Sequence, residues 1–259
     1  MKRMVALAAL LWLAVPGLSP ADEPPPASTA PAVPPDDALE SQGAVIGEIK
    51  VNVGDVFNPE DPEENRRLFL IANKLHRTTR DSVILDQLLF RSGDRYSRRL
   101  LDESERILRQ DRYLYDAEIR PVRYNGNRVD VEVVTRDVWT LNVGVNLGRS
   151  GGVSSTGFQL QDTNLLGTGK SVTLAHSSNV DRTSSLFQYD DAAVLGSRVR
   201  LGAGYSDNSD GNVRHLALGR PFYSLDARWA AQMNALVADQ VDTHYELGHI
   251  ASGFRHQEG

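Results

Sequence analysis

The chain has 259 residues, of which 41% are hydrophobic and 24% charged, so it can bury at least one sizeable core and has room for about two domains. A formal net charge of -6, with no Lys/Arg run after the first residues, excludes strong attraction to phosphate backbones, and we expect no nucleic-acid partner. The absence of cysteine excludes disulfide frameworks, thiol catalysis and Cys-based zinc sites.

The N-terminal segment has the layout of a secretory signal. A basic pair precedes an apolar stretch that is too short to span a bilayer as a helix, and Ser19 and Ala21 are small residues of the kind a signal peptidase needs. We therefore predict a signal peptide over residues 1–21. Residues 22–43 are predicted to be a linker, because Pro, Ala, Glu and Ser dominate its first part. No later stretch is apolar for long enough to predict a transmembrane helix.

A small α+β domain is predicted over residues 44–137. Residues 45–53 are rich in β-branched side chains and predict a strand, and residues 58–65 predict a loop because they hold two prolines. Residues 68–75 are apolar without a clear period and stay unassigned. Residues 81–90 carry apolar side chains at helical spacing, with Asp81 as the expected N-cap.

A second helix is predicted to begin behind Ser97 as its N-cap. One of its faces is apolar and the other charged. The apolar face comprises Leu100, Leu101, Ile107 and Leu108, and the side expected to face water comprises Arg98, Arg99, Asp102, Glu105 and Arg106.

Two strands are predicted over residues 117–123 and 128–135, joined by a tight turn at Asn125-Gly126. The expected order is strand, helix, helix, strand, strand. Residues 93–97 (Gly-Asp-Arg-Tyr-Ser) and 112–117 (Arg-Tyr-Leu-Tyr-Asp-Ala) resemble the sequences that flank the second helix of a polypeptide-transport-associated (POTRA) domain. The resemblance covers the whole segment, and a generic small α+β domain is the alternative.

From residue 138 to residue 259 the sequence changes to short alternating runs separated by Gly, Asn, Asp and Ser clusters. Apolar side chains alternate with small or polar ones over residues 141–147, 158–161, 198–205 and 225–237. Such alternation predicts antiparallel strands with one lipid-facing and one wet face, although a soluble sandwich also alternates. Strand length, polar faces rich in Arg, Gln and Asn, and the preceding signal favour the transmembrane barrel.

Two turns carry a sharper family resemblance. Residues 162–171 (Asp-Thr-Asn-Leu-Leu-Gly-Thr-Gly-Lys-Ser) resemble the first periplasmic turn of the barrels in the BamA/TamA superfamily of outer-membrane assembly factors, and residues 220–226 (Arg-Pro-Phe-Tyr-Ser-Leu-Asp) are similar to a later one. The resemblance implies a POTRA-like domain followed by the N-terminal portion of an outer-membrane β-barrel over residues 138–259. We count roughly eight strands, the lower bound for a closed barrel and about half of the superfamily's number.

Short patterns that resemble catalytic or phosphate-binding motifs lie in surroundings that do not fit those functions. Residues 148–152 fit G-x-S-x-G, but strands flank them, so a hairpin loop is expected rather than a nucleophile elbow. Residues 169–171 (Gly-Lys-Ser) end like a phosphate-binding loop, but Asn164 stands where its first glycine should be. The histidines follow no metal-ligand spacing. We therefore expect no catalytic residue, no cofactor, no metal site and no enzymatic activity.

The resemblance implies a role in inserting outer-membrane proteins or in moving polypeptides across that membrane. The expected partners are outer-membrane lipids, unfolded polypeptide clients and periplasmic accessory proteins, with the small domain in the periplasm. A client strand could add to an exposed sheet edge, for which residues 44–53, 128–135 and 139–147 are candidates. The residues expected to contact it are Val129, Val131, Val133, Leu141, Val143 and Val145.

Other readings stay open at this stage. The chain could be a two-partner secretion transporter or a simple pore, or a soluble periplasmic adhesion or scaffold sandwich. The superfamily's Arg-Gly-Phe lid-loop motif has no match. We therefore expect either a fragment or truncated gene product of a larger barrel, or a small divergent barrel.

Overall fold

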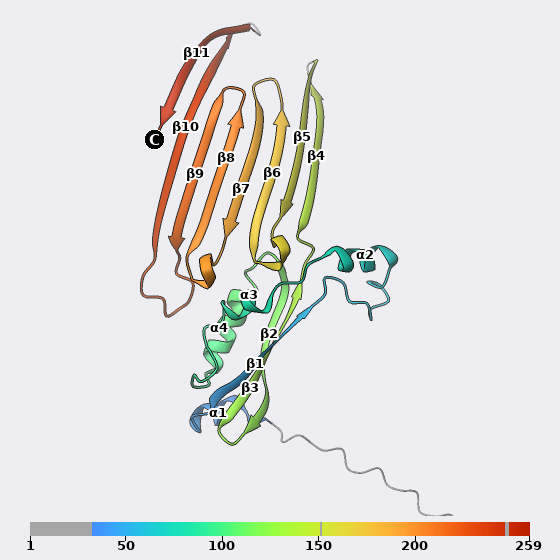
Figure 1. Cartoon of the computed structure of the whole chain (residues 1–259), viewed down its shortest axis with the longest axis vertical. Coiled ribbons are helices and arrows are strands. Elements are labelled where there is room, and N and C mark those ends of the chain that lie inside the picture. Colours follow the sequence, from blue (N-terminus) through green and yellow to red (C-terminus); the bar gives the residue numbers. More distant parts are fainter. Residues whose placement is uncertain (1–32, 151, 247–248) are drawn as a thin grey trace, which may run out of the picture. The chain divides into compact units, whose positions relative to one another are not determined.

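The structure, a computed structural model, describes residues 33–150, 152–246 and 249–259. The predicted signal peptide and residues 22–32 of the predicted linker lie outside the described residues. The described chain forms a three-stranded sheet accompanied by helices and an eight-stranded antiparallel sheet (Figure 1). No helix in this part of the chain is long and apolar enough to cross a membrane.

The elements follow one another in a simple order. The helices are α1 (Asp36–Ser41), α2 (Arg67–Leu75), α3 (Asp81–Leu85) and α4 (Arg98–Leu108), with two 3-10 turns, η1 (Leu165–Gly167) and η2 (Val194–Gly196). The small sheet consists of β1 (Val45–Gly54), β2 (Leu114–Asn125) and β3 (Arg128–Asp137). The large sheet consists of β4 (Leu141–Ser150), β5 (Val153–Asp162), β6 (Lys170–Ser178), β7 (Thr183–Asp191), β8 (Arg200–Asn208), β9 (Gly211–Arg220), β10 (Ala231–Glu246) and β11 (His249–Glu258).

The small sheet has β3 at its centre, parallel to β1 and antiparallel to β2. Val129, Val131 and Val133 are completely buried, because this strand is covered by the apolar face of α4 as well as flanked on both sides. The expectation of an exposed edge over residues 128–135 was therefore wrong. The edges of this sheet belong to β1 and β2.

The helix predicted over residues 81–90 is shorter than expected. It ends at Leu85, although Leu88 and Phe90 are buried in the core as their apolar character suggested. Beyond the end of the helix, the backbone N–H of Leu89 donates to the hydroxyl of Ser104 at 2.9 Å. This side chain supplies the acceptor that a helical carbonyl would otherwise provide. The predicted N-cap was also wrong, since Asp81 is the first helical residue.

In α4 the expected N-cap position of Ser97 is confirmed, but its side chain makes no capping bond. Arg99, Asp102 and Arg106 are exposed, as predicted. Glu105 is not: it is buried, and its carboxylate accepts the backbone N–H of Ile119 in β2 at 2.6 Å. The expectation that Glu105 faces water was wrong because the strand edge offered a donor that the sequence pattern could not reveal.

Two further helices form where none was predicted. The segment that was left unassigned forms α2. Helix α1 lies within the predicted linker, and its Leu39 is fully buried in the domain core with Val33 packed against the same cluster. The folded region thus begins before residue 44, because apolar side chains at the end of the Pro-rich stretch find a core to enter.

Every neighbouring pair in the large sheet is antiparallel, and the strands run in sequence order from β4 to β11. The predicted strand over residues 225–237 begins only at Ala231, since Arg220 donates to the carbonyl of Trp229 and residues 221–230 form a turn. In the small sheet, the pairing of Asn125 with Arg128 places Gly126 and Asn127 at the centre of the hairpin turn, one residue later than expected. Only Gly126 has a positive φ there.

Candidate functional site

One face of the large sheet carries an exposed row of mainly apolar side chains that crosses from β4 to β10. Residues on neighbouring strands are direct partners in the register, so a row of side chains crosses from strand to strand on one side. One such row consists of Val143, Leu160, Leu174, Phe187, Tyr205, Arg214 and Val237. Val143 is 61% exposed and Phe187 46% exposed. Exposed apolar side chains gathered on one face in this way are typical of a surface that binds protein or lipid.

The opposite face of the same strands is polar. The adjacent row, again paired strand by strand, begins with Asn142, Gln161, Thr173 and Gln188. Gln161 donates to the hydroxyl of Thr173 at 3.2 Å, so neighbouring polar side chains bond along the row. The period-2 pattern predicted from the sequence is thus confirmed for these rows, with mainly apolar side chains on one face of β4 to β7 and a polar row on the other.

The strand β4 lies at one end of the large sheet and pairs only with β5 among the residues that the structure describes. Its register with β5 has no shift, and the N–H of Thr163 donates to the carbonyl of Thr140 at 3.1 Å just before the strand begins. Hydrogen-bonded and non-hydrogen-bonded pairs alternate along an antiparallel ladder. Leu141, Val143 and Val145 therefore direct their backbone N–H and C=O groups away from β5, toward the open edge.

The six predicted client-contact residues fall into two sets that the structure does not bring together. Leu141, Val143 and Val145 lie on the open edge of the large sheet and are 40%, 61% and 68% exposed. The other three, Val129, Val131 and Val133, are core residues of the small sheet. Only the β4 set offers unpaired backbone groups.

The turns after β5 and β7 share one local structure. In each turn an aspartate accepts the N–H two residues later, Asp162 from Asn164 and Asp191 from Ala193, both at 3.0 Å. Leu166 and Leu195 then adopt positive φ values of 54° and 52°. The sequence signal for this repeat is Asp-x-x-[Leu/Val]-Leu-Gly at residues 162–167 and 191–196, and only the first copy was among the predicted turns.

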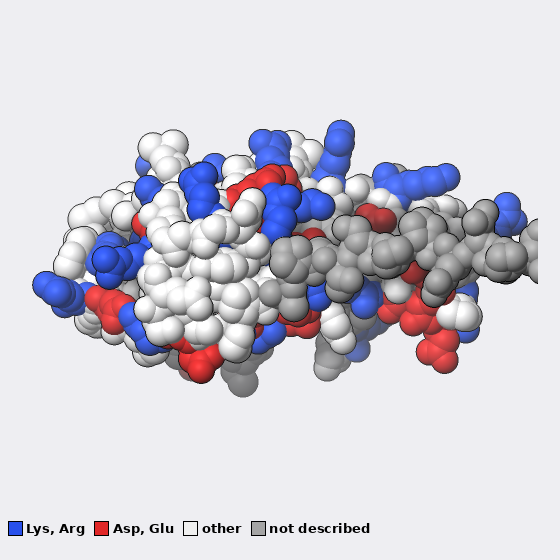
Figure 2. All heavy atoms as spheres, turned by 90° about the horizontal axis from the view of Figure 1, so that it is seen from below, with Lys and Arg blue, Asp and Glu red and all other residues white. Residues whose placement is uncertain are grey.

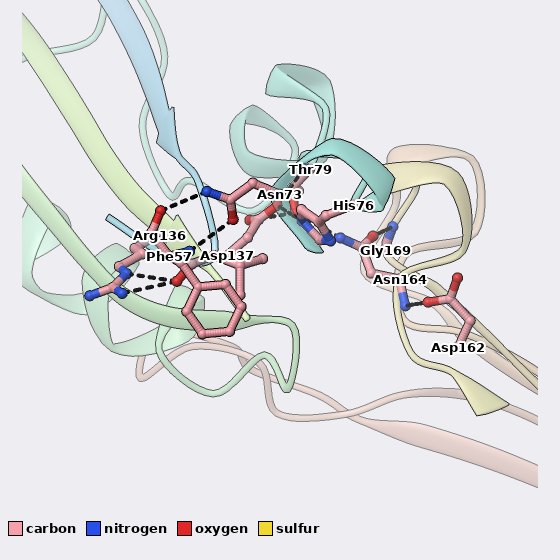
Figure 3. A network of polar contacts seen from close by, with 10 residues as sticks. Phe57, Asn73, His76, Thr79, Arg136, Asp137, Asp162, Asn164 and Gly169 are labelled. Carbon is pink, nitrogen blue, oxygen red and sulfur yellow. Dashed lines mark hydrogen bonds and ion pairs between the residues drawn. The ribbon is translucent and has the colours of Figure 1, made fainter. Parts of the chain in front are cut away.

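The first of these turns is fixed to the small domain by a buried polar network (Figure 3). The carboxylate of Asp137, at the end of β3, accepts the N–H of Thr79 at 2.7 Å and its hydroxyl at 2.8 Å, and lies 2.8 Å from Nε2 of His76. Asn164 continues the network: it donates to the Thr79 hydroxyl at 2.8 Å and accepts the N–H of Gly169 at 2.7 Å. Asp137, Thr79 and Asn164 are all buried.

Backbone contacts bring the two parts closer still. The N–H of Arg80 donates to the carbonyl of Gly167 at 2.9 Å. Gly167 has φ +71°, and a Cβ there would lie 2.2 Å from the carbonyl oxygen of Thr78. Glycine is therefore required at this position both for its backbone conformation and for the close approach.

The next two turns of the large sheet also contact the helices of the small domain. Arg198 donates to the carbonyl of Leu88 at 2.8 Å. In the third turn, the N–H of Leu225 donates to the buried carboxylate of Glu103. Successive turns thus bind successive parts of the small domain, which holds it in one position relative to the foot of the strands.

A cavity next to these contacts contains a buried acidic group, and Tyr113 and Asp111 are among its lining residues. The phenol of Tyr113 donates to Asp111 at 2.9 Å and accepts the side-chain amide of Gln87 at 2.8 Å. Burial raises the pKa of the Asp111 carboxyl above its ordinary value, and burial also raises the pKa of Tyr113. We assign this pair a packing role, because its hydrogen bonds join Tyr113 to Gln87 and Asp111 within the small domain.

Charges of both signs are interspersed on one face of the molecule. On the face that Figure 2 shows, Lys and Arg side chains stand among Asp and Glu side chains. Among the described residues no group of His, Asp and Glu is arranged to hold a metal ion.

Solved structures that are similar in fold to this chain include a BamA and a CdiB. No protein-family model matches the sequence, and no curated protein matches it. The structure of BamA from Haemophilus ducreyi lacking POTRA domains 1–3 is 17% identical with a TM-score of 0.48, and covers 75% of this chain and 36% of that chain. CdiB from Acinetobacter baumannii is 14% identical with a TM-score of 0.49, and covers 77% of this chain and 38% of that chain. The chain therefore spans little more than a third of either protein.

Proposed function

We propose that this chain provides the opening strands of an outer-membrane β-barrel that assembles or translocates polypeptides, and that it receives its clients by strand addition along β4. The observation that carries the proposal is the open edge at Leu141, Val143 and Val145. An extended client that pairs there gains main-chain hydrogen bonds whatever its sequence, which suits a protein that handles many clients.

A membrane location is supported by the two faces of the large sheet. Its strands β4 to β9 have 9 or 10 residues each, the length that a tilted transmembrane strand needs. The exposed apolar rows would face lipid, and the polar rows would face water. In a membrane, backbone N–H and C=O groups need a hydrogen-bond partner from another strand or from water. The outward-directed groups of β4 would therefore bind a further strand.

The small domain is proposed to be POTRA-like and to lie in the periplasm. Its order of strand, helices, strand, strand and its central β3 support this assignment. The contacts from Asp137, Leu88 and Glu103 to the turns would hold it at the periplasmic mouth, where a client arrives before it reaches β4.

The test removes edge donors without touching the β4–β5 ladder. In the double variant Val143→Pro, Val145→Pro both lost N–H groups point to the open side, so the pairing with β5 is kept. The matched control is Val143→Ala, Val145→Ala, which shortens the same side chains and keeps both donors. Each protein is reconstituted into phosphatidylethanolamine and phosphatidylglycerol vesicles, and the folding of a urea-denatured outer-membrane protein is followed by protease protection.

We expect the proline variant to lose most of its acceleration of client folding and the alanine variant to keep it. Equal acceleration by the proline and parent proteins would contradict strand addition at β4. Ion conductance without any acceleration by the parent protein would favour a pore or a two-partner secretion transporter instead.

A further inference from the structure

The segment from residue 66 to residue 80 differs in charge from the rest of the chain. It contains five Lys or Arg residues and no Asp or Glu, whereas the whole chain has a formal net charge of -6. The five cations are Arg66, Arg67, Lys74, Arg77 and Arg80, and all of them are exposed. Among the residues that the structure describes, none of the five has a carboxylate within ion-pair distance, although sixteen ion pairs form outside this segment.

Helix α2, which lies in this segment, has two different faces. One face is attached to the protein: Phe69 stacks on Phe57 with ring centroids 4.4 Å apart, and Asn73 bonds both the N–H and the carbonyl of Phe57. Leu68 and Ile71 lie on the other side, because helical residues are 100° apart, and they are 72% and 52% exposed. Within the described part of the chain, Leu68 and Ile71 therefore present most of their apolar surface outward.

The end of the segment is fixed at the foot of the large sheet. His76 and Thr79 bond Asp137, which lies four residues before β4 begins, and Arg80 bonds Gly167 in the turn between β5 and β6. The apolar face of the sheet starts at this level with Leu141. The turn itself carries the 59% exposed side chain of Leu166. Helix α2 therefore lies near the end of the large sheet at which β4 begins. In a membrane-spanning arrangement, this is the level at which the sheet would enter the membrane.

We propose that α2 lies in the headgroup layer of the periplasmic leaflet, with Leu68 and Ile71 in the acyl boundary and the cations of residues 66–80 on lipid phosphates. This inference rests on the proposed membrane-spanning role of the large sheet. A helix that carries cations and exposed apolar side chains binds an anionic interface through both contributions. The acidic segment of residues 60–64 precedes the helix, and Glu64 within it is paired with Arg136, so the basic side is that of α2 and of the segment after it. A phospholipid surface matches both the charge and the apolar pair, and it is the surface that lies beside this position in a membrane-spanning arrangement.

The experiment uses the complete chain and its lack of cysteine. Single substitutions Leu68→Cys, Ile71→Cys and Asn125→Cys each create one site for an environment-sensitive fluorophore. Asn125 is the matched control, because it is exposed at the far end of β2 and β3, roughly 30 Å along β3 from Asp137. The labelled proteins are reconstituted into phosphatidylethanolamine and phosphatidylglycerol vesicles, with and without lipids that carry a quencher.

We expect labels at residues 68 and 71 to shift their emission to the blue and to be quenched from the lipid, and the label at residue 125 to be quenched only from water. Charge reversal by Arg66→Glu, Arg67→Glu and Lys74→Glu, all at exposed positions, should remove most of the lipid quenching at residue 71. Vesicles of phosphatidylcholine alone should weaken it.

Labels at residues 68 and 71 that stay as accessible to an aqueous quencher as the label at residue 125, in protein that resists alkaline extraction, would overturn the position of α2 alone. Shielding from the aqueous quencher without lipid quenching would also overturn it, because a second protein copy would then cover the helix. A chain that alkaline washing releases would overturn the membrane-spanning sheet, and this inference with it.

Discussion

The carboxylate of Asp137 should control how firmly the small domain is attached to the first turn of the large sheet. It accepts two hydrogen bonds from Thr79 and lies against His76, all within a buried region. Asp137→Ala leaves the Thr79 N–H without its acceptor. A buried donor that loses its acceptor costs about 1–3 kcal/mol.

We take about 3 kcal/mol as the loss, which corresponds to roughly a hundredfold increase in the population of the opened junction. Amide hydrogen exchange of Thr79 and Arg80 measures that opening directly, in detergent-solubilised full-length protein. We expect the protection of both amides to fall by about two orders of magnitude. Asp137→Asn keeps an oxygen for the Thr79 N–H and should give a smaller loss.

The matched control is Asp102→Ala, which removes a carboxylate from an exposed ion pair with Arg98. Such pairs contribute at most about 1 kcal/mol, so exchange at Thr79 and Arg80 should stay unchanged. Protection that survives in Asp137→Ala, with the rest of the domain equally protected, would refute the role of this carboxylate in the junction.

Two further predictions concern the same region. Gly167→Ala should destabilise the protein more than Gly126→Ala, although the φ values of the two glycines, +71° and +66°, are similar. The positive φ costs each alanine about 1 kcal/mol, but only the Cβ at residue 167 also meets backbone atoms, at Thr78. Equal melting temperatures of the two variants, measured by the loss of the β signal on heating, would argue against the close approach. Asp111→Asn should stabilise the protein increasingly as the pH rises above 3.8, because the raised pKa of Asp111 makes the folded state lose stability when that carboxyl ionises. Parallel melting curves at acidic and neutral pH for variant and parent would contradict this.

The faces of the large sheet were predictable because the information is local. Alternation at residues 141–147 assigns Val143 to one side and Asn142 to the other wherever the strand lies, and the neighbouring strands repeat the pattern. The first turn was found by its motif, and its copy at residues 191–196 could have been found by comparing the two segments. In the small domain the apolar spacing of α4 identified its buried side.

Other features depended on which segments meet. The sequence could not tell that β3 lies between β1 and β2, because a strand of alternating valines suits an edge as well as a centre when one face is buried. Nor could it tell that Glu105 would find a backbone donor on β2, or that Leu39 would reach the core from a Pro-rich stretch.

The sequence by itself determined the small α+β domain and the antiparallel strands, the apolar and polar rows of those strands, and the turn at residues 162–171. Each of these features follows from residues that are a few positions apart. Tertiary structure decided the junction, in which Thr79 bonds Asp137 58 positions away and Asn164 85 positions away. Such bonds form only after distant segments have packed together. A polar side chain in water bonds to water, and it needs a particular protein partner only when packing has buried both groups.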